Sequence, residues 1–159
     1  MTDEQWGMFD LVALPLDPLP VIAEFNNLID VWKHTRGDAL LPRWPDFSFD
    51  ELMPWIGQLA VSEFDGKDEL HFKLFGGTFV KLFDQELTGK PLCGSLLPEQ
   101  REGSRTHFMK LISGPFIGHG KGKVPAIDRD HIDFNVIDLP LAENGRDVSH
   151  FLHGVFVQN

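Results

Sequence analysis

The chain has 159 residues, 42% of them hydrophobic, and its 14 Lys and Arg against 24 Asp and Glu give a formal net charge of −10. This length suits one domain with a core of its own, and the charge disfavours binding to nucleic acid or to anionic membranes. The single cysteine has no intramolecular partner, the N-terminus is acidic and no apolar run reaches ~20 residues, so we expect a cytoplasmic protein.

The N-terminal part of the chain is expected to hold little regular structure before its first helix. Residues 1–18 show no sustained hydrophobic period and end among prolines, which predicts an irregular arm. A single domain should then occupy residues 19–159. Apolar residues recur every three or four positions over 19–36, which predicts a helix. The proline-rich stretch 41–57 predicts a bent connector with one or two helical turns.

Two strands are expected next, at 59–64 and 70–75, joined by a polar connection that contains glycine. In the second strand Leu70, Phe72 and Leu74 share one face by simple alternation, so this face should be the buried one.

Glycine corners and two helices follow the second strand. Gly76 and Gly77 should end the strand, and the short helix after them should point Phe79 and Phe83 inward. A longer helix is expected over 98–112, with proline at its start and charges that suit the helix dipole.

The C-terminal part of the chain predicts three more strands. Residues 116–124 read as a short edge strand that dissolves into a Gly/Lys loop. Strands at 131–139 and 148–157 flank Asn144 and Gly145, a dipeptide typical of hairpins.

Several short motifs of this chain together resemble a known family. They are Trp32, Leu41-Pro-Arg43, Asp46-Phe47, Leu74-Phe-Gly-Gly-Thr78, Leu87-Thr-Gly-Lys-Pro91 and Leu139-Pro-Leu141 with Asn144-Gly145. Over about residues 27–157 the chain is similar to the short, stand-alone bacterial PAS proteins. The resemblance implies an α+β fold: a PAS-like antiparallel five-stranded sheet with helices on one face and an N-terminal helical extension. PAS domains bind haem, flavin, small organic ligands or nothing, so the resemblance names no cofactor.

A ligand pocket of such a domain would lie between the inner sheet face and the short helices. The residues expected to line it are Trp55, Phe72, Leu74, Phe79, Phe83, His107, Phe108, Leu111, Phe134 and Phe151. The alternative is a solid core made of the same side chains, because protein interiors normally pack without voids. The resemblance makes His107 the best-placed haem ligand, with a hydrogen-bonded histidine as the simpler interpretation.

The function that this sequence favours is a cytoplasmic sensory module for signal transduction. It would bind a small, mostly apolar ligand and signal through a protein partner or as a homodimer, with no nucleic acid and no membrane involved. The alternative is a ligand-free interaction or dimerisation module. No Gly-x-Ser-x-Gly or phosphate loop is present, so we expect no enzymatic activity. The spacing of the His and Asp residues offers no set of three or four convergent ligands, so we expect no metal site. A third possibility, an enzyme of the cone-shaped α+β class, would show a polar pocket with an Asp/His pair.

Overall fold

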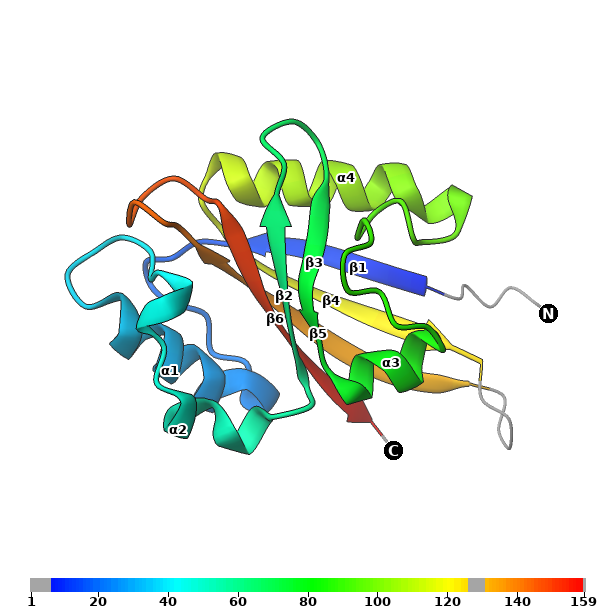
Figure 1. The fold of residues 1–159 in the computed structure, drawn as a ribbon, viewed down its shortest axis with the longest axis horizontal. Helices are drawn as coiled ribbons and strands as arrows, with labels where there is room; N and C mark the ends of the chain where they lie inside the picture. Colours follow the sequence, from blue (N-terminus) through cyan, green and yellow to red (C-terminus); the bar gives the residue numbers. More distant parts are fainter. Residues whose placement is uncertain (1–6, 126–130, 159) are drawn as a thin grey trace.

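The computed structural model describes residues 7–125 and 131–158, and these residues form one six-stranded antiparallel sheet with helices on both faces (Figure 1). The order of strands in the sheet is β1-β4-β5-β6-β2-β3. The strands are β1 (Gly7–Leu14), β2 (Leu59–Phe64), β3 (Leu70–Phe75), β4 (Ile117–Val124), β5 (Ile132–Leu141) and β6 (His150–Gln158). The helices are α1 (Asn26–Arg36), α2 (Phe49–Leu52), α3 (Gly77–Phe83) and α4 (Pro98–Ser113).

The α+β class and the antiparallel sheet are confirmed, but the expectation of five strands is wrong. The sixth strand, β1, falls inside the segment expected to be an irregular arm, and it pairs with β4 at one edge of the sheet. Asp10 has a positive φ of 53°, and the register of β1 shifts between Phe9 and Val12. A bulge of this kind breaks the two-residue alternation, which is why the strand is hard to see in the sequence.

The segment expected to dissolve into a Gly/Lys loop is instead a full strand, β4, held between β1 and β5. The glycines of β4 leave one face of the strand without side chains of its own, and side chains from neighbouring elements fill this space. A Cβ on Gly120 would lie 2.5 Å from Leu11, and one on Gly122 would clash with the ring of Phe134. The alternating glycines are therefore required by close packing.

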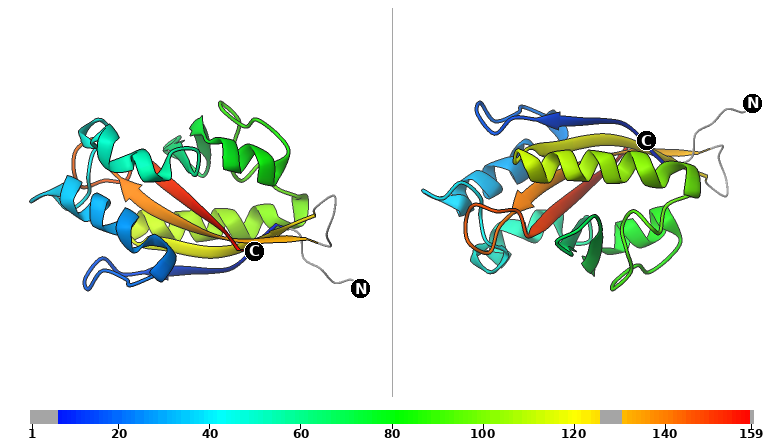
Figure 2. Two further views of the ribbon diagram at one scale, coloured as in Figure 1. Left: turned by 90° about the horizontal axis from the view of Figure 1, so that it is seen from below. Right: turned by 90° about the horizontal axis from the view of Figure 1, so that it is seen from above.

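The helices divide between the two faces of the sheet, which corrects the expectation that all of them gather on one face. Ile137 of β5 lies in one core with α1, whereas its neighbour Val136 lies in another with α3. Because successive residues of a strand point to opposite faces, α1 and α3 cover opposite faces. The view from above in Figure 2 shows α4 running along β1 and β4.

The face covered by α1 is closed by close contacts and by one buried hydrogen bond. Trp32 Nε1 donates to the carbonyl of Pro140 at 2.9 Å. A Cβ on Gly154 would lie 2.6 Å from Leu28, so glycine lets α1 approach β6. The buried residues of this face form one hydrophobic core. Within the described ranges, no helix is both long and apolar enough to cross a membrane.

Candidate ligand-binding pocket

The opposite face of the sheet carries a small pocket between β3, β5 and β6 on one side and α3, the chain before α4, and α4 on the other. Most of its lining residues are apolar, and they come from segments far apart in the sequence. They are Met8, Leu11, Phe72, Phe75, Phe79, Phe83, Leu87, Leu92, Leu96, Ser104, His107, Phe108, Val136, Asp138 and His153. The pocket has a volume of about 60 Å³, far below the roughly 300–1000 Å³ of pockets for drug-sized ligands.

Half of the residues expected from the sequence line this pocket. They are Phe72, Phe79, Phe83, His107 and Phe108. Leu111, Phe134 and Phe151 are buried in the core of the same face without lining the pocket. The pocket and the solid core are thus both present, side by side on one face.

Leu74 was expected to line the pocket and does not. Lys73 is an extra residue in β3, because Val61 and Ser62 of β2 pair with Leu74 and Phe72. This bulge turns Leu74 outward, where it is 43% exposed, and Phe75 takes its place in the pocket wall.

Trp55 was also expected in the pocket and lies on the other face of the sheet. The connector before β2 packs against α1, and the indole of Trp55 stacks on Phe25 with ring centroids 5.8 Å apart. The expected helical turn of this connector is present as α2, but the sequence pattern does not say which face of the sheet the connector covers.

Two lining residues come from β1 and were missed because β1 was expected to be irregular. Met8 and Leu11 close the pocket at the strand edge, and Leu11 reaches over the space that Gly120 leaves open. The alternation of glycine with other residues in β4 is the signal that could have predicted a strand with one bare face.

One end of the pocket is polar and buried. His153 Nδ1 on β6 donates to Asp138 Oδ1 on β5 at 2.7 Å, and His107 Nε2 on α4 lies 3.5 Å from the other carboxylate oxygen. The side chains of His107, Asp138 and His153 are 6%, 5% and 3% exposed. Register places Asp138 opposite His153, and Val136, two residues before Asp138 on β5, lines the pocket beside them.

The carboxylate of Asp138 stays ionised despite its burial. Burial raises the pKa of Asp138, because it disfavours the charged form, but the imidazoles of His107 and His153 beside the carboxylate outweigh this effect. The pKa of Asp138 therefore lies below its ordinary value of 3.8. The pocket thus presents a fixed negative group next to two imidazoles.

A serine completes a chain of hydrogen bonds behind this cluster. Ser62 Oγ and His153 Nε2 share a hydrogen bond of 2.8 Å, so Ser62, His153 and Asp138 have the connectivity of a hydrolase triad. A nucleophile must reach its substrate, and Ser62 is fully buried and does not line the pocket that the described residues form. The serine orients His153 and is not placed to attack a ligand.

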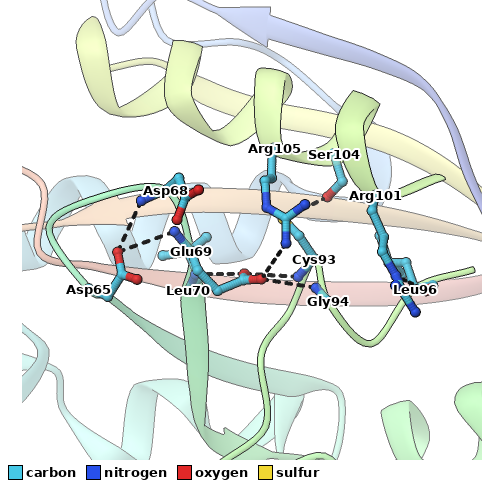
Figure 3. Close-up of polar contacts among 10 residues, drawn as sticks. All are labelled: Asp65, Asp68, Glu69, Leu70, Cys93, Gly94, Leu96, Arg101, Ser104 and Arg105. Carbon is cyan, nitrogen blue, oxygen red and sulfur yellow. Dashed lines mark hydrogen bonds and ion pairs between the residues drawn. The ribbon is translucent and has the colours of Figure 1, made fainter. Parts of the chain in front are cut away.

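A second buried carboxylate ties the pocket wall to α4 (Figure 3). Glu69, at the start of β3, accepts hydrogen bonds from the backbone N–H groups of Leu70, Cys93 and Gly94 at 2.8–3.0 Å. Arg105 of α4 reaches the same carboxylate at 3.4 Å. This arrangement fixes the chain before α4 against both β3 and the helix.

Cys93 adds a further contact between this segment and α4. Its thiol lies 3.2 Å from the hydroxyl of Ser104, a pocket-lining residue. Burial raises the pKa of the Cys93 thiol to about 12, even though the hydrogen bond with Ser104 favours the thiolate. Cys93 is therefore an unreactive packing residue.

A second cavity of about 190 Å³ adjoins the pocket between β1 and the first turns of α4. The two cavities share Met8, Leu11 and Ser104. Gln100 accepts a hydrogen bond from Met8 N at 3.1 Å on the wall of the second cavity. Met8, Leu11 and Ser104 thus separate the second cavity from the pocket.

The residues present do not fit a haem or a flavin. Either group needs far more space than the pocket volume of about 60 Å³. His107, the haem-ligand candidate, has its Nε2 directed at Asp138 instead. In the described part of the chain, no three His, Cys, Asp or Glu side chains are grouped so that they could hold a metal ion.

Comparisons with known proteins identify the family of the chain. A sequence model described as "PAS domain" matches residues 23–156. Among solved structures, an RNA-binding light-oxygen-voltage receptor is similar at 14% identity with a TM-score of 0.47, over 93% of this chain and 38% of that chain. This chain thus spans less than half of that receptor's chain, and a search of the curated proteins finds no match. Because the family match covers most of its length, the chain belongs to the PAS domain family.

Proposed function

We propose that this protein is a cytoplasmic PAS-type sensory module that binds a small, mostly apolar molecule in the pocket between the sheet, α3 and α4. The observation that carries the proposal is the pocket itself: an aromatic cavity that ends in a buried polar cluster. A domain that needed only to be stable would fill this space, because interiors pack to the density of crystals. The volume of about 60 Å³ supports a ligand much smaller than a nucleotide cofactor.

The signal would leave the domain through α4 and the segment before it. Phe108, His107 and Ser104 line the pocket from α4, while Glu69 and Cys93 fix the adjoining segment to the same helix. A ligand that moves one pocket wall would therefore also shift α4. We propose that a protein partner, or a second copy of the chain, reads this shift.

Nucleic acid and catalysis are not part of this proposal. The net charge of −10 works against phosphate contacts, although the similar light-oxygen-voltage receptor is described as RNA-binding. The Asp/His pair required by the enzyme alternative is present, but the wall around it is mainly hydrocarbon and the only hydroxyl bonded to His153 among the described residues is the buried Ser62.

Native mass spectrometry of the purified protein tests the proposal. We expect a retained small molecule, or a rise in melting temperature with members of a metabolite panel. Val136→Phe, which fills the pocket, should abolish both effects, whereas the matched Val12→Phe, at a half-exposed site of β1, should leave them unchanged. Circular dichroism checks that both variants are folded.

The ligand-free alternative makes the opposite prediction. A pure interaction module would show a dimer mass with no bound molecule, no thermal shift with any compound, and no difference between wild type and Val136→Phe in either assay. That combination would refute the proposed ligand-binding function.

A further inference from the structure

The polar end of the pocket is incompletely hydrogen-bonded. Among the described residues, His107 Nε2 is buried and has no hydrogen-bond partner, since the 3.5 Å to Asp138 Oδ2 exceeds the usual range. Asp138 Oδ1, in contrast, is held by His153 at 2.7 Å. Buried polar groups are nearly always paired, so this gap points to a partner from outside the chain.

The neighbouring strand leaves no room for a side chain that could fill this gap. A Cβ on Gly118 of β4 would lie 2.8 Å from Asp138 Oδ2, 3.0 Å from His107 Nε2 and 2.6 Å from Leu111. A serine or threonine at this position would clash before its hydroxyl could bond. The side from which a partner could approach His107 and Asp138 is therefore the pocket that both residues line.

The two groups at this gap select the chemistry of a partner. The carboxylate oxygen of Asp138 accepts hydrogen bonds, and the imidazole of His107 offers either an N–H or a lone pair. An anionic head group would be repelled by the carboxylate. The carboxylate oxygen 3.5 Å from His107 Nε2 favours the tautomer with an N–H at this atom, and an ammonium group could not accept a hydrogen bond from it. A hydroxyl both donates and accepts, so it can bridge the two residues while the rest of the molecule contacts the aromatic wall.

We propose that the pocket binds a small neutral apolar molecule with one hydroxyl group, which lies between His107 and Asp138. This inference rests on the proposed function, because it concerns the ligand of the same pocket. The hydroxyl would donate to Asp138 Oδ2 and accept from the His107 N–H. The polar end of the pocket then acts as a selector for alcohols or phenols over hydrocarbons of equal size.

Phenol and toluene test this inference, because they match in size and differ in one hydroxyl. In an NMR titration of the wild-type protein, phenol should bind at least about tenfold more tightly than toluene, the effect of one hydrogen bond to a charged group. Benzoate and benzylammonium should bind more weakly than phenol. Equal or tighter binding of toluene would overturn the inference and leave the pocket as a ligand site.

Variants locate the preference for the hydroxyl. His107→Leu and Asp138→Asn should each reduce the ratio of phenol to toluene affinity to about threefold or less, whereas His34→Ala, an exposed histidine on α1, should leave it unchanged. An unchanged ratio in both pocket variants would refute the assigned role of the pair. If neither probe perturbs pocket resonances of the wild type, the proposed pocket function fails together with the inference.

Discussion

At the corner between β3 and α3, alanine should have opposite effects on stability at the two neighbouring positions Gly76 and Gly77. A Cβ on Gly76 would lie 2.5 Å from the carbonyl oxygen of Gly57 and 2.6 Å from that of Leu59. These carbonyls cannot move freely, because they accept the backbone N–H groups of Thr78 and Gly76 at 2.8 and 2.9 Å. Around Gly77, in contrast, a Cβ would meet nothing within 4 Å.

Gly76→Ala should therefore lower the free energy of unfolding by about 3 kcal/mol, the upper end of the overpacking range, since the clash is with backbone. Gly77→Ala should raise it by about 0.4–1 kcal/mol, because alanine restricts the unfolded chain. Urea unfolding followed by circular dichroism measures both values. In thermal melts the first change corresponds to a loss of about 6–12 °C. This reasoning would be refuted if Gly76→Ala changed the free energy of unfolding by less than about 0.5 kcal/mol, or if Gly77→Ala lowered it as much as Gly76→Ala does.

Four further predictions concern the buried polar groups and α4. Glu69→Ala leaves three backbone N–H groups without their acceptor and should lower the free energy of unfolding by about 3 kcal/mol. The amide hydrogens of Cys93 and Gly94 should then exchange faster, and unchanged exchange rates would contradict this prediction. The pKa of the Cys93 thiol is raised from 9.0 to about 12, so at pH 8 its thiolate fraction is about a thousandfold lower than that of an ordinary cysteine. Cys93 should therefore react with Ellman's reagent only after unfolding. Rapid reaction of the native protein would argue against this burial. Gly103→Ala, in the exposed interior of α4 with free space around it, should stabilise the protein by about 0.5–1 kcal/mol in urea unfolding, and a loss of stability would show a hidden contact. Because folding lowers the pKa of Asp138, the ionised carboxylate stabilises the fold above its ordinary pKa of 3.8, and this stabilisation is lost as the pH falls toward the folded pKa. The free energy of unfolding of the wild type relative to that of Asp138→Asn should thus shrink from pH 5 to pH 3. An increase of this difference over the same range would contradict the lowered pKa.

Local patterns predicted the class of fold and most of its elements, because hydrophobic periods and turn residues are properties of short segments. The strands at 59–64 and 70–75 are present with the predicted bounds. The errors arise where one residue is inserted into a strand: the bulge at Lys73 exchanged the pocket-facing residue of β3, and the irregular register at Asp10 concealed β1. In both cases the period of two, on which the prediction depends, fails locally.

The polar end of the pocket was missed for a different reason. His107 was selected by resemblance, but Asp138 and His153 lie on separate strands whose contact depends on register and on the approach of α4. Neither register nor helix docking is encoded in a short window of sequence. The aromatic wall was easier to predict, since large apolar side chains on an inward face have few other places to go.

The glycine face of β4 also shows that residues outside the family match help to set the volume of the pocket. The residues that lie over Gly120 on this face, Met8 and Leu11, belong to β1, which precedes the matched range 23–156. Exchanging Leu11 for alanine or phenylalanine would enlarge or reduce the pocket while every element of the matched range stays the same. The volume of the pocket thus depends in part on a strand that the family pattern does not include.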